Sequence, residues 1–241
     1  MANLIFSKLI TSENEIFSAI DSSTSNNSKL LVTYLNQHCF NIYCSDSAYR
    51  NLLENHFKVY ADGAGINFAY RFLWQKHYVH FNATDLNEKI INILTDKSVK
   101  FYIVGGNFSE EEVNSKFKNN NSFAGYLNGY FDDSDIQDIA NTINKQKPEV
   151  ILIGMGVPKQ EIIAEKLSNK VDTSLFICVG NFFEFYLGTV KRIPEKYRNW
   201  GVEWIYRLFQ EPKRLWNRYI IGIPLFIFRV MKFKLLNSKI G

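Results

Sequence analysis

Cysteine and histidine are scarce in this sequence, and neither residue is spaced as a metal ligand. The three cysteines form no Cys-x-x-Cys pair and leave an odd one, and no secretory signal is evident, so we expect reduced thiols in a cytosolic protein. The four histidines are scattered, which argues against a zinc site. Long disordered or low-complexity segments are also missing. Apolar residues make up 46% of the 241 positions, enough for one α/β domain with or without an appendage.

A hydrophobic run long enough to cross a membrane is missing too. The stretch 219–230 is apolar, but Gly222 and Pro224 interrupt it, and it is shorter than the roughly 20 residues of a spanning helix. Charge is unevenly distributed instead. Residues from Lys191 onward hold 12 Lys/Arg and 3 Asp/Glu, a balance of +9, which leaves 28 − 12 = 16 basic and 24 − 3 = 21 acidic residues before them, a balance of −5. This asymmetry predicts an anionic partner, either a membrane surface or nucleic acid.

Apolar runs typical of buried strands alternate with helical patterns along the first 190 residues. We expect strands at 30–35, around 57–61, at 100–104, 150–153 and 175–179, each ending in glycine or a polar residue. The sequence therefore predicts an α/β fold, a Rossmann-like doubly wound and mostly parallel sheet over residues 1–190. Residues 191–241 form a basic, aromatic and helical C-terminal appendage. Ligand is expected along the carboxyl ends of the strands.

The connecting segments allow further predictions. Residues 1–30 are expected to form a short strand and then a helix, with Ser12 as its cap, and residues 46–54 another helix. The segment 125–131 reads as a glycine- and aromatic-rich loop, in which Tyr126 and Tyr130 either stack on a base or sugar or simply pack. Asp133-Ser134-Asp135 resembles the metal-binding Asp-x-Asp of many sugar transferases, but acidic residues before a helical pattern favour a helix cap.

The turn Ala61-Asp62-Gly63-Ala64-Gly65 joins a strand to a helix and organises the candidate site. Gly63 and Gly65 let the backbone turn sharply and approach a ligand, and the helix N-terminus favours an anion such as a diphosphate. Asp62 stands where a carboxylate can act as a general base. The alternative is that Asp62 only caps the helix, and this stretch alone favours the cap. Asn36, at the end of the 30–35 strand, binds ligand or ties its turn, and unaided the turn is favoured.

Two other strands end in glycine turns of the same kind. Gly105-Gly106 precedes one helix, and Gly154-Met155-Gly156 leads through Lys159 and Gln160 into another. At this helix start, those two side chains contact phosphate or sugar, or are ordinary surface residues. The third glycine of a dinucleotide fingerprint is missing after both Gly63/Gly65 and Gly154/Gly156, so a nicotinamide-dependent dehydrogenase is weakly supported.

The C-terminal segment alternates basic with aromatic residues. Its arginines include Arg192, Arg207 and Arg214, and its tryptophans are Trp200, Trp204 and Trp216. Such a pattern beside an apolar stretch is typical of an interfacial helix on anionic lipid. Two alternatives remain: a helix packed on the main domain with solvated arginines, and a nucleic-acid-binding surface.

These motifs together resemble the WecG/TagA/CpsF glycosyltransferase family, also called glycosyltransferase family 26. The resemblance runs roughly from Leu30 to the end. The matching pieces are Ala61–Gly65, Gly125-Tyr126, Gly129–Phe131, Gly154–Glu161 and, most distinctively, Gly188–Tyr219 with Arg192-Ile193-Pro194, Gly201–Trp204 and Gln210–Trp216.

The resemblance implies an inverting, metal-independent glycosyltransferase of surface polysaccharide biosynthesis that needs no cofactor. It would move a sugar from a UDP-sugar, often UDP-N-acetylmannosamine or its uronic acid, to an undecaprenyl-diphosphate-linked sugar. Asp62 would be the general base, with Asn36 as a second catalytic residue. The implied substrate-binding residues are Gly63, Gly65, Asp85, Gly105, Gly106, Tyr126, Tyr130, Gly154, Gly156, Pro158, Lys159, Gln160, Arg192, Arg207 and Arg214.

The resemblance also implies where the protein works. The appendage would dock on an anionic membrane and complete the site, so the protein would be cytoplasmic and peripheral on the inner face of the bacterial cell membrane. Nucleic acid is then not a partner, and a homo-oligomer stays open. Tyr34 and His80 stand where the family usually has Thr and Arg, so both are candidates for setting the sugar specificity.

Overall fold

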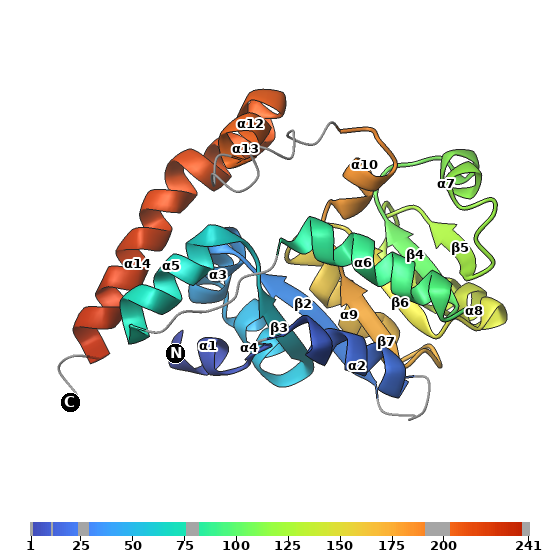
Figure 1. Cartoon of the computed structure of the whole chain (residues 1–241), viewed down its shortest axis with the longest axis horizontal. Coiled ribbons are helices and arrows are strands. Elements are labelled where there is room, and N and C mark those ends of the chain that lie inside the picture. Colours follow the sequence, from blue (N-terminus) through green and yellow to red (C-terminus); the bar gives the residue numbers. More distant parts are fainter. Residues whose placement is uncertain (1, 11, 24–28, 76–81, 191–202, 238–241) are drawn as a thin grey trace.

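The computed structural model describes residues 2–10, 12–23, 29–75, 82–190 and 203–237. Within them the strands form one parallel sheet of seven strands, in the order β1-β3-β2-β7-β6-β4-β5 (Figure 1). The strands are β1 (Leu9–Ile10), β2 (Leu30–Leu35), β3 (Phe57–Ala61), β4 (Phe101–Gly105), β5 (Phe123–Leu127), β6 (Val150–Gly154) and β7 (Leu175–Cys178). The central strands are mostly apolar because helices cover them on both sides, as in β6, where residues 150–153 are at most 1% exposed.

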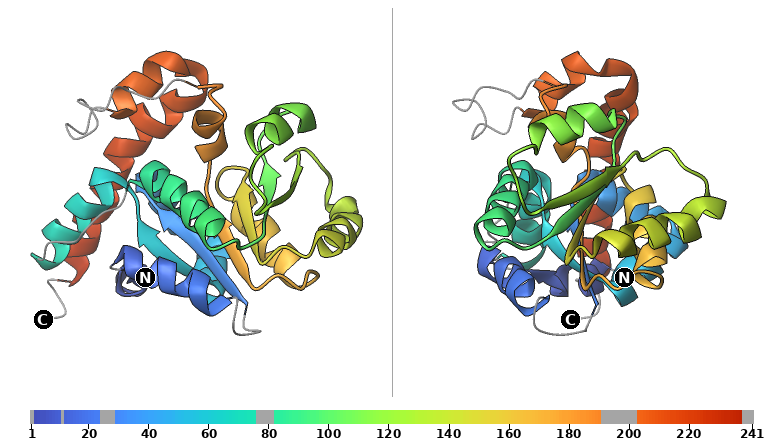
Figure 2. Two further views of the ribbon diagram at one scale, coloured as in Figure 1. Left: turned by 45° about the vertical axis from the view of Figure 1, so that its right-hand side comes forward. Right: turned by 90° about the vertical axis from the view of Figure 1, so that its right-hand side faces the viewer.

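Helices cover both faces of the sheet, as Figure 2 shows in its edge-on view. On one face lie α2 (Glu13–Ser23) and α6 (Ala83–Asp96), and on the other α3 (Gln37–Ser45), α4 (Ser47–His56), α8 (Ile136–Gln146) and α9 (Lys159–Ser168). The remaining helices of the first 190 residues are α1 (Ala2–Ser7), α5 (Gly63–Trp74), α7 (Glu110–Lys116) and α10 (Phe182–Tyr186). The predicted doubly wound α/β fold is therefore confirmed.

Some local predictions were confirmed and others were wrong. Ser12 accepts the N–H group of Glu15 and starts α2 as expected, and Ser109 accepts the N–H group of Glu112 at the start of α7. The helix α1 ahead of the short strand was not predicted, and neither was α3. The predicted loop at 125–131 was wrong for its first three residues, which belong to β5. Gly125 fits this strand because a Cβ there would lie 2.6 Å from the Tyr102 ring.

The C-terminal segment is folded against the main domain. It comprises α12 (Glu203–Gln210), α13 (Pro212–Trp216), a π-helical turn η2 (Asn217–Ile221) and α14 (Gly222–Asn237), and α14 runs along α3 and α5 (Figure 1). Phe226 packs edge-to-face on Phe40 at 5.5 Å between ring centroids, and Lys234 donates to the Phe72 carbonyl at 2.8 Å. The packing that this alternative predicted is thus confirmed for α14, but its arginine is not merely solvated, because Arg229 donates to Asn41 Oδ1. The proposed boundary at 190/191 adjoins residues 191–202, which lie outside the described part.

Candidate active site

The carboxyl ends of the strands bring the predicted turns to one edge of the sheet. Asp62 follows β3, Asn36 follows the adjacent β2, and Gly180 follows β7, which is the next strand across. The glycines that end β6 and β4 continue the row. Residues far apart in sequence thus line the edge where open α/β sheets bind their ligands.

Asp62 occupies the position before α5, but its side chain does not cap that helix. Its Oδ1 accepts the N–H of Ala83, the first residue of α6, at 3.0 Å, and its Oδ2 accepts a long hydrogen bond from Asn36 Nδ2 at 3.4 Å. The capping interpretation of Asp62 was therefore wrong. Gly63, with φ of +79°, turns the chain here, and the carboxylate faces the N-terminus of the neighbouring helix.

The environment of Asp62 suits a general base. Partial burial raises the pKa of its carboxyl, against the opposing effects of the Ala83 N–H, Arg207, Asn36 and Arg218. A carboxylate with a raised pKa takes a proton more readily than an ordinary aspartate does, and these donors keep it anionic and oriented.

Asn36 ties its turn, as the sequence alone favoured, and its binding of ligand stays a prediction. Its Oδ1 accepts the main-chain N–H groups of His38 and Cys39 at 3.0 and 3.1 Å and so caps α3. Its Nδ2 points to Asp62. The amide therefore links the start of α3 to the candidate base.

Two arginines of the C-terminal segment act on Asp62. Arg207, on α12, lies with its guanidinium 4.6 Å from the centre of the Phe185 ring, and Arg218 lies on the π-helical turn. Both charges lower the pKa of Asp62. Burial, and to a smaller extent the charge of Arg218, lowers the pKa of His38 to about 4. Among the described residues the buried Nε of Arg218 has no hydrogen-bond acceptor.

Sequence reasoning did not single out Arg218 among the basic residues of its run. The only signal was its place in the alternating basic and aromatic pattern, because nothing in the sequence marks the π-helical turn that aims it. Two other predicted arginines are not tested: Arg192 and the side chain of Arg214 lie outside the described part.

The turn from β6 to α9 contains the remaining cationic candidate. Lys159 Nζ donates to the Gly129 carbonyl at 3.0 Å and lies 6.0 Å from the centre of the Tyr130 ring, which is 76% exposed. Gly156 has φ of +74°, and no other group of the described residues lies within 4 Å of a Cβ built there, so ligand can approach this backbone past the described residues. Pro158 sits between them, directly before α9.

Other predicted site residues are buried and stabilise the turns by hydrogen bonds and close packing. Gln160 is fully buried, and its Oε1 accepts the Gly180 N–H at 2.9 Å. The Tyr126 hydroxyl bonds both main-chain groups of Phe108 at 3.2 Å, so its ring packs and the stacking alternative does not apply to it. Gly105 is pressed against the next turn, since a Cβ there would lie 2.3 Å from the Gly154 carbonyl oxygen.

The last three predicted positions are simple to place. Gly106 turns toward Phe108, Gly65 faces Gln37 and Phe226, and Asp85 lies in the first turn of α6, where Asn82 accepts its N–H.

The Asp-x-Asp segment serves the start of α8. Asp135 accepts the Asp132 N–H at 2.9 Å, and Asp133 pairs with Lys166 at 2.6 Å. This bond closes the 3₁₀ turn η1 (Asp133–Asp135) that leads into α8, whereas α8 itself has no side-chain cap hydrogen bond, so the cap interpretation is confirmed only for the turn. In the part of the chain that the structure describes, no group of three or more His, Cys, Asp or Glu side chains is arranged to hold a metal ion.

Sequence reasoning did not identify Glu161, a buried carboxyl group, as a residue of interest. Glu161 is fully buried, and its Oε1 accepts hydrogen bonds from Thr33 Oγ1 at 2.7 Å and Gln160 Nε2 at 2.8 Å. Burial raises the pKa of Glu161 to about 7. In the sequence it looks like an ordinary acid in the first turn of a helix, so nothing pointed to it.

Comparison with known proteins shows the family of the chain. The model of the glycosyl transferase WecG/TagA/CpsF family matches residues 4–240. Two relatives from Staphylococcus aureus, strains MRSA252 and MW2, are each 28% identical over 210 residues, 85% of this chain and 81% of the relative. Both are named N-acetylglucosaminyldiphosphoundecaprenol N-acetyl-beta-D-mannosaminyltransferase, and neither supports the nucleic-acid alternative. The chain therefore belongs to the WecG/TagA/CpsF family of glycosyltransferases.

Proposed function

We propose that this glycosyltransferase moves an N-acetylmannosamine-type sugar from its UDP donor to N-acetylglucosaminyl-diphospho-undecaprenol in surface polysaccharide biosynthesis. The observation that carries the proposal is Asp62, a carboxylate of raised pKa held at the carboxyl edge of the sheet between Asn36 and the N-terminus of α6. The names of the S. aureus relatives supply the sugar and the lipid-linked acceptor.

The proposed reaction is a single displacement. An acceptor hydroxyl attacks the anomeric carbon of the donor, the bond from that carbon to the diphosphate oxygen breaks with its electrons, and UDP leaves. Asp62 takes the proton from the attacking hydroxyl. A single displacement inverts the anomeric carbon, so an α-linked donor gives the β-linked product that the relatives' names describe.

Fixed positive groups would stabilise the departing diphosphate. Arg207 and Arg218 act on the Asp62 side of the edge, and Lys159 lies on the β6 side. Arg192 and Arg214 remain proposed members of this group. Such preorganised charges stabilise a leaving oxyanion as it forms and need no reorganisation during the reaction.

We further propose that α14 places the protein on the inner face of the bacterial cell membrane. The exposed large apolar side chains of the π-helical turn and α14 are each 38–65% exposed: Ile220, Ile221, Leu225, Ile227, Phe228, Met231, Leu235 and Leu236. The charge balance of +9 from Lys191 onward complements anionic lipid. In the described residues no helix is both long enough and apolar enough to cross a membrane.

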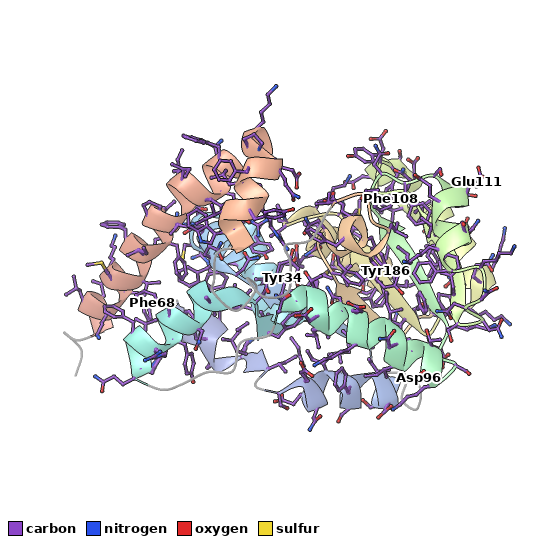
Figure 3. All side chains as sticks on the ribbon, turned by 45° about the horizontal axis from the view of Figure 1, so that its top comes forward. Tyr34, Phe68, Asp96, Phe108, Glu111 and Tyr186 are labelled. Atoms are coloured by element: carbon purple, nitrogen blue, oxygen red, sulfur yellow. The ribbon has the colours of Figure 1, made fainter. Side chains whose placement is uncertain are left out.

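A donor panel tests the proposed reaction. Purified protein in detergent and EDTA is given one UDP-sugar at a time with N-acetylglucosaminyl-diphospho-undecaprenol, and the lipid product is identified by mass. We expect transfer from UDP-N-acetylmannosamine without added metal. Transfer only from another sugar would overturn the donor assignment and direct attention to Tyr34 (labelled in Figure 3), whose hydroxyl lies 2.5 Å from a Cβ built on Gly180 at the carboxyl edge of the sheet. No transfer from any donor, with or without divalent metal, would overturn the reaction itself.

Vesicle flotation tests the membrane proposal. Wild-type protein should float with vesicles containing phosphatidylglycerol, and the double variant Phe228→Glu/Met231→Glu should not. Ile162→Glu is the matched control, because Ile162 is a 39% exposed apolar residue on α9, away from α14. Equal flotation of all three proteins would contradict the docking face. Salt-sensitive binding to RNA or DNA in place of vesicles would favour the nucleic-acid alternative.

A further inference from the structure

Asn41 is a buried polar residue that the proposed mechanism does not use. It lies in the middle of α3 and bonds two places on α14. Its Nδ2 donates to the Gly222 carbonyl at 2.7 Å, and its Oδ1 accepts from Arg229 Nη1 at 3.2 Å. The same Nη1 donates to the Asn41 main-chain carbonyl. Gly222 and Arg229 are seven residues apart and so lie two turns apart on one face of α14, and we call the three residues the Asn41 clamp.

The clamp lies between two parts of the candidate site. On one side, α3 begins at Asn36, whose Nδ2 points to Asp62. On the other side, Gly222 directly follows the π-helical turn that carries Arg218, and its N–H bonds to the Asn217 carbonyl within that turn. Single π-helical turns are unusual and frequently occur at functional sites, because they re-aim the side chains they contain.

We propose that Asn41 is a positioning residue that fixes Arg218 relative to Asp62. The close approach at Gly222 fits this role, since a Cβ there would lie 3.3 Å from the Asn217 carbonyl oxygen and 3.6 Å from Asn41 Nδ2. Without the clamp, the start of α14 loses its polar attachment to α3, and the π-helical turn is free to shift. The inference rests on the proposed function for its kinetic consequence, but the geometry it concerns can be measured separately.

The charges around Asp62 determine what a shift of Arg218 would do. Arg207 of α12 and Arg218 of the π-helical turn are the cations that lower the pKa of Asp62, together with the Ala83 N–H and Asn36. Neighbouring groups on the other elements, namely Tyr34, Cys39 and Tyr60, have pKa values raised by burial and stay neutral. If Arg218 moves away, one of the groups that counteract the effect of burial is lost, and the pKa of Asp62 therefore rises further.

The test compares Asn41→Ala with Lys234→Met. Lys234 is a matched control because it also ties α14 to the main domain, through the Phe72 carbonyl, but far from the π-helical turn. For Asn41→Ala we expect kcat to fall about tenfold, the size expected for a lost charge-assisted contact in the transition state. The acid limb of its pH–rate profile should move to higher pH. Lys234→Met should keep the wild-type profile.

A double-mutant cycle and a direct titration separate positioning from general loosening. If Asn41 acts through Arg218, the Asn41→Ala/Arg218→Gln double variant loses no more activity than Arg218→Gln alone. In selectively ¹³C-labelled protein, the Asp62 carboxyl should titrate at higher pH in Asn41→Ala than in wild type, whether or not the protein transfers sugar. Arg229→Gln, which opens the clamp from its other side, should give the same shift. Additive losses, or an unchanged Asp62 titration in both clamp variants, would overturn the proposal.

Discussion

Asp62 shows how a site residue acquires its properties from distant parts of the chain. Its two oxygens are held by Asn36, 26 residues before it, and by Ala83, 21 residues after it. Its opposing cations come from α12 and the π-helical turn. The sequence could place Asp62 at the end of a strand, because the strand and the glycine turn are local signals. It could not show these partners, so the local pattern favoured a helix cap.

The pH dependence of activity follows from the raised pKa of Asp62. Only the carboxylate can accept a proton, so activity is lost as pH falls through this pKa. Because burial raises the pKa, the loss should begin at higher pH than for an ordinary aspartate of about 3.9. Arg207→Gln removes an opposing charge and should move the acid limb of kcat/KM further upward. The acid limb of the kcat/KM profile should persist in Glu161→Gln. If the limb disappears in that variant, the titrating group is Glu161 and not Asp62.

Glu161 makes a separate prediction about stability. Its pKa is about 7 in the folded protein and about 4.3 when unfolded, so between these values the folded state binds the extra proton. The free energy of unfolding should therefore decrease as pH rises from 5 to 8, by roughly 3 kcal/mol from this group. Glu161→Gln removes this dependence and keeps an acceptor for Thr33. Urea unfolding midpoints of wild type and Glu161→Gln, measured at pH 5 and at pH 8, test this prediction. If the difference between the two proteins is the same at both pH values, the prediction is contradicted.

At the scale of elements, the strands other than β5 were predictable and the C-terminal packing was not. Strands such as β6 are continuous apolar runs because both faces are covered, and a run of this kind is visible locally. Docking of α14 depends on contacts with α3 and α5 that span more than 150 residues, such as Arg229 to Asn41. Its sequence is apolar on nearly all sides, so periodicity could not tell the packed face from the exposed one.

Phe226 and Phe228 allow the two faces of α14 to be compared directly. Phe226 is 2% exposed and packs on Phe40, whereas Phe228 is 62% exposed. Phe226→Ala should therefore destabilise the protein by about 3 kcal/mol, and Phe228→Ala by less than about 0.5 kcal/mol. Urea unfolding measures both values. Similar losses for the two variants would contradict the assigned packing face.

At the scale of the whole molecule, the fold combines the candidate site at the carboxyl edge of the sheet with an exposed apolar surface on the C-terminal helices. Figure 1 shows α12 and α13 at the end of the molecule where the carboxyl ends of the strands lie, with α14 running down from them. The C-terminal segment thus contributes arginines to the candidate site and an apolar face to the surface. The proposed transfer to a lipid-linked acceptor would use both.

The measurement that tests the account most directly compares wild type with Asp62→Asn in acceptor-dependent UDP release, with EDTA present and UDP affinity measured by calorimetry. Asp62→Asn keeps the size of the side chain and removes the base, so kcat should fall by about 10²–10⁴-fold while UDP binds as in wild type. Normal turnover by Asp62→Asn would contradict the assignment of Asp62 as the base, and with it the mechanism built on the geometry of this edge.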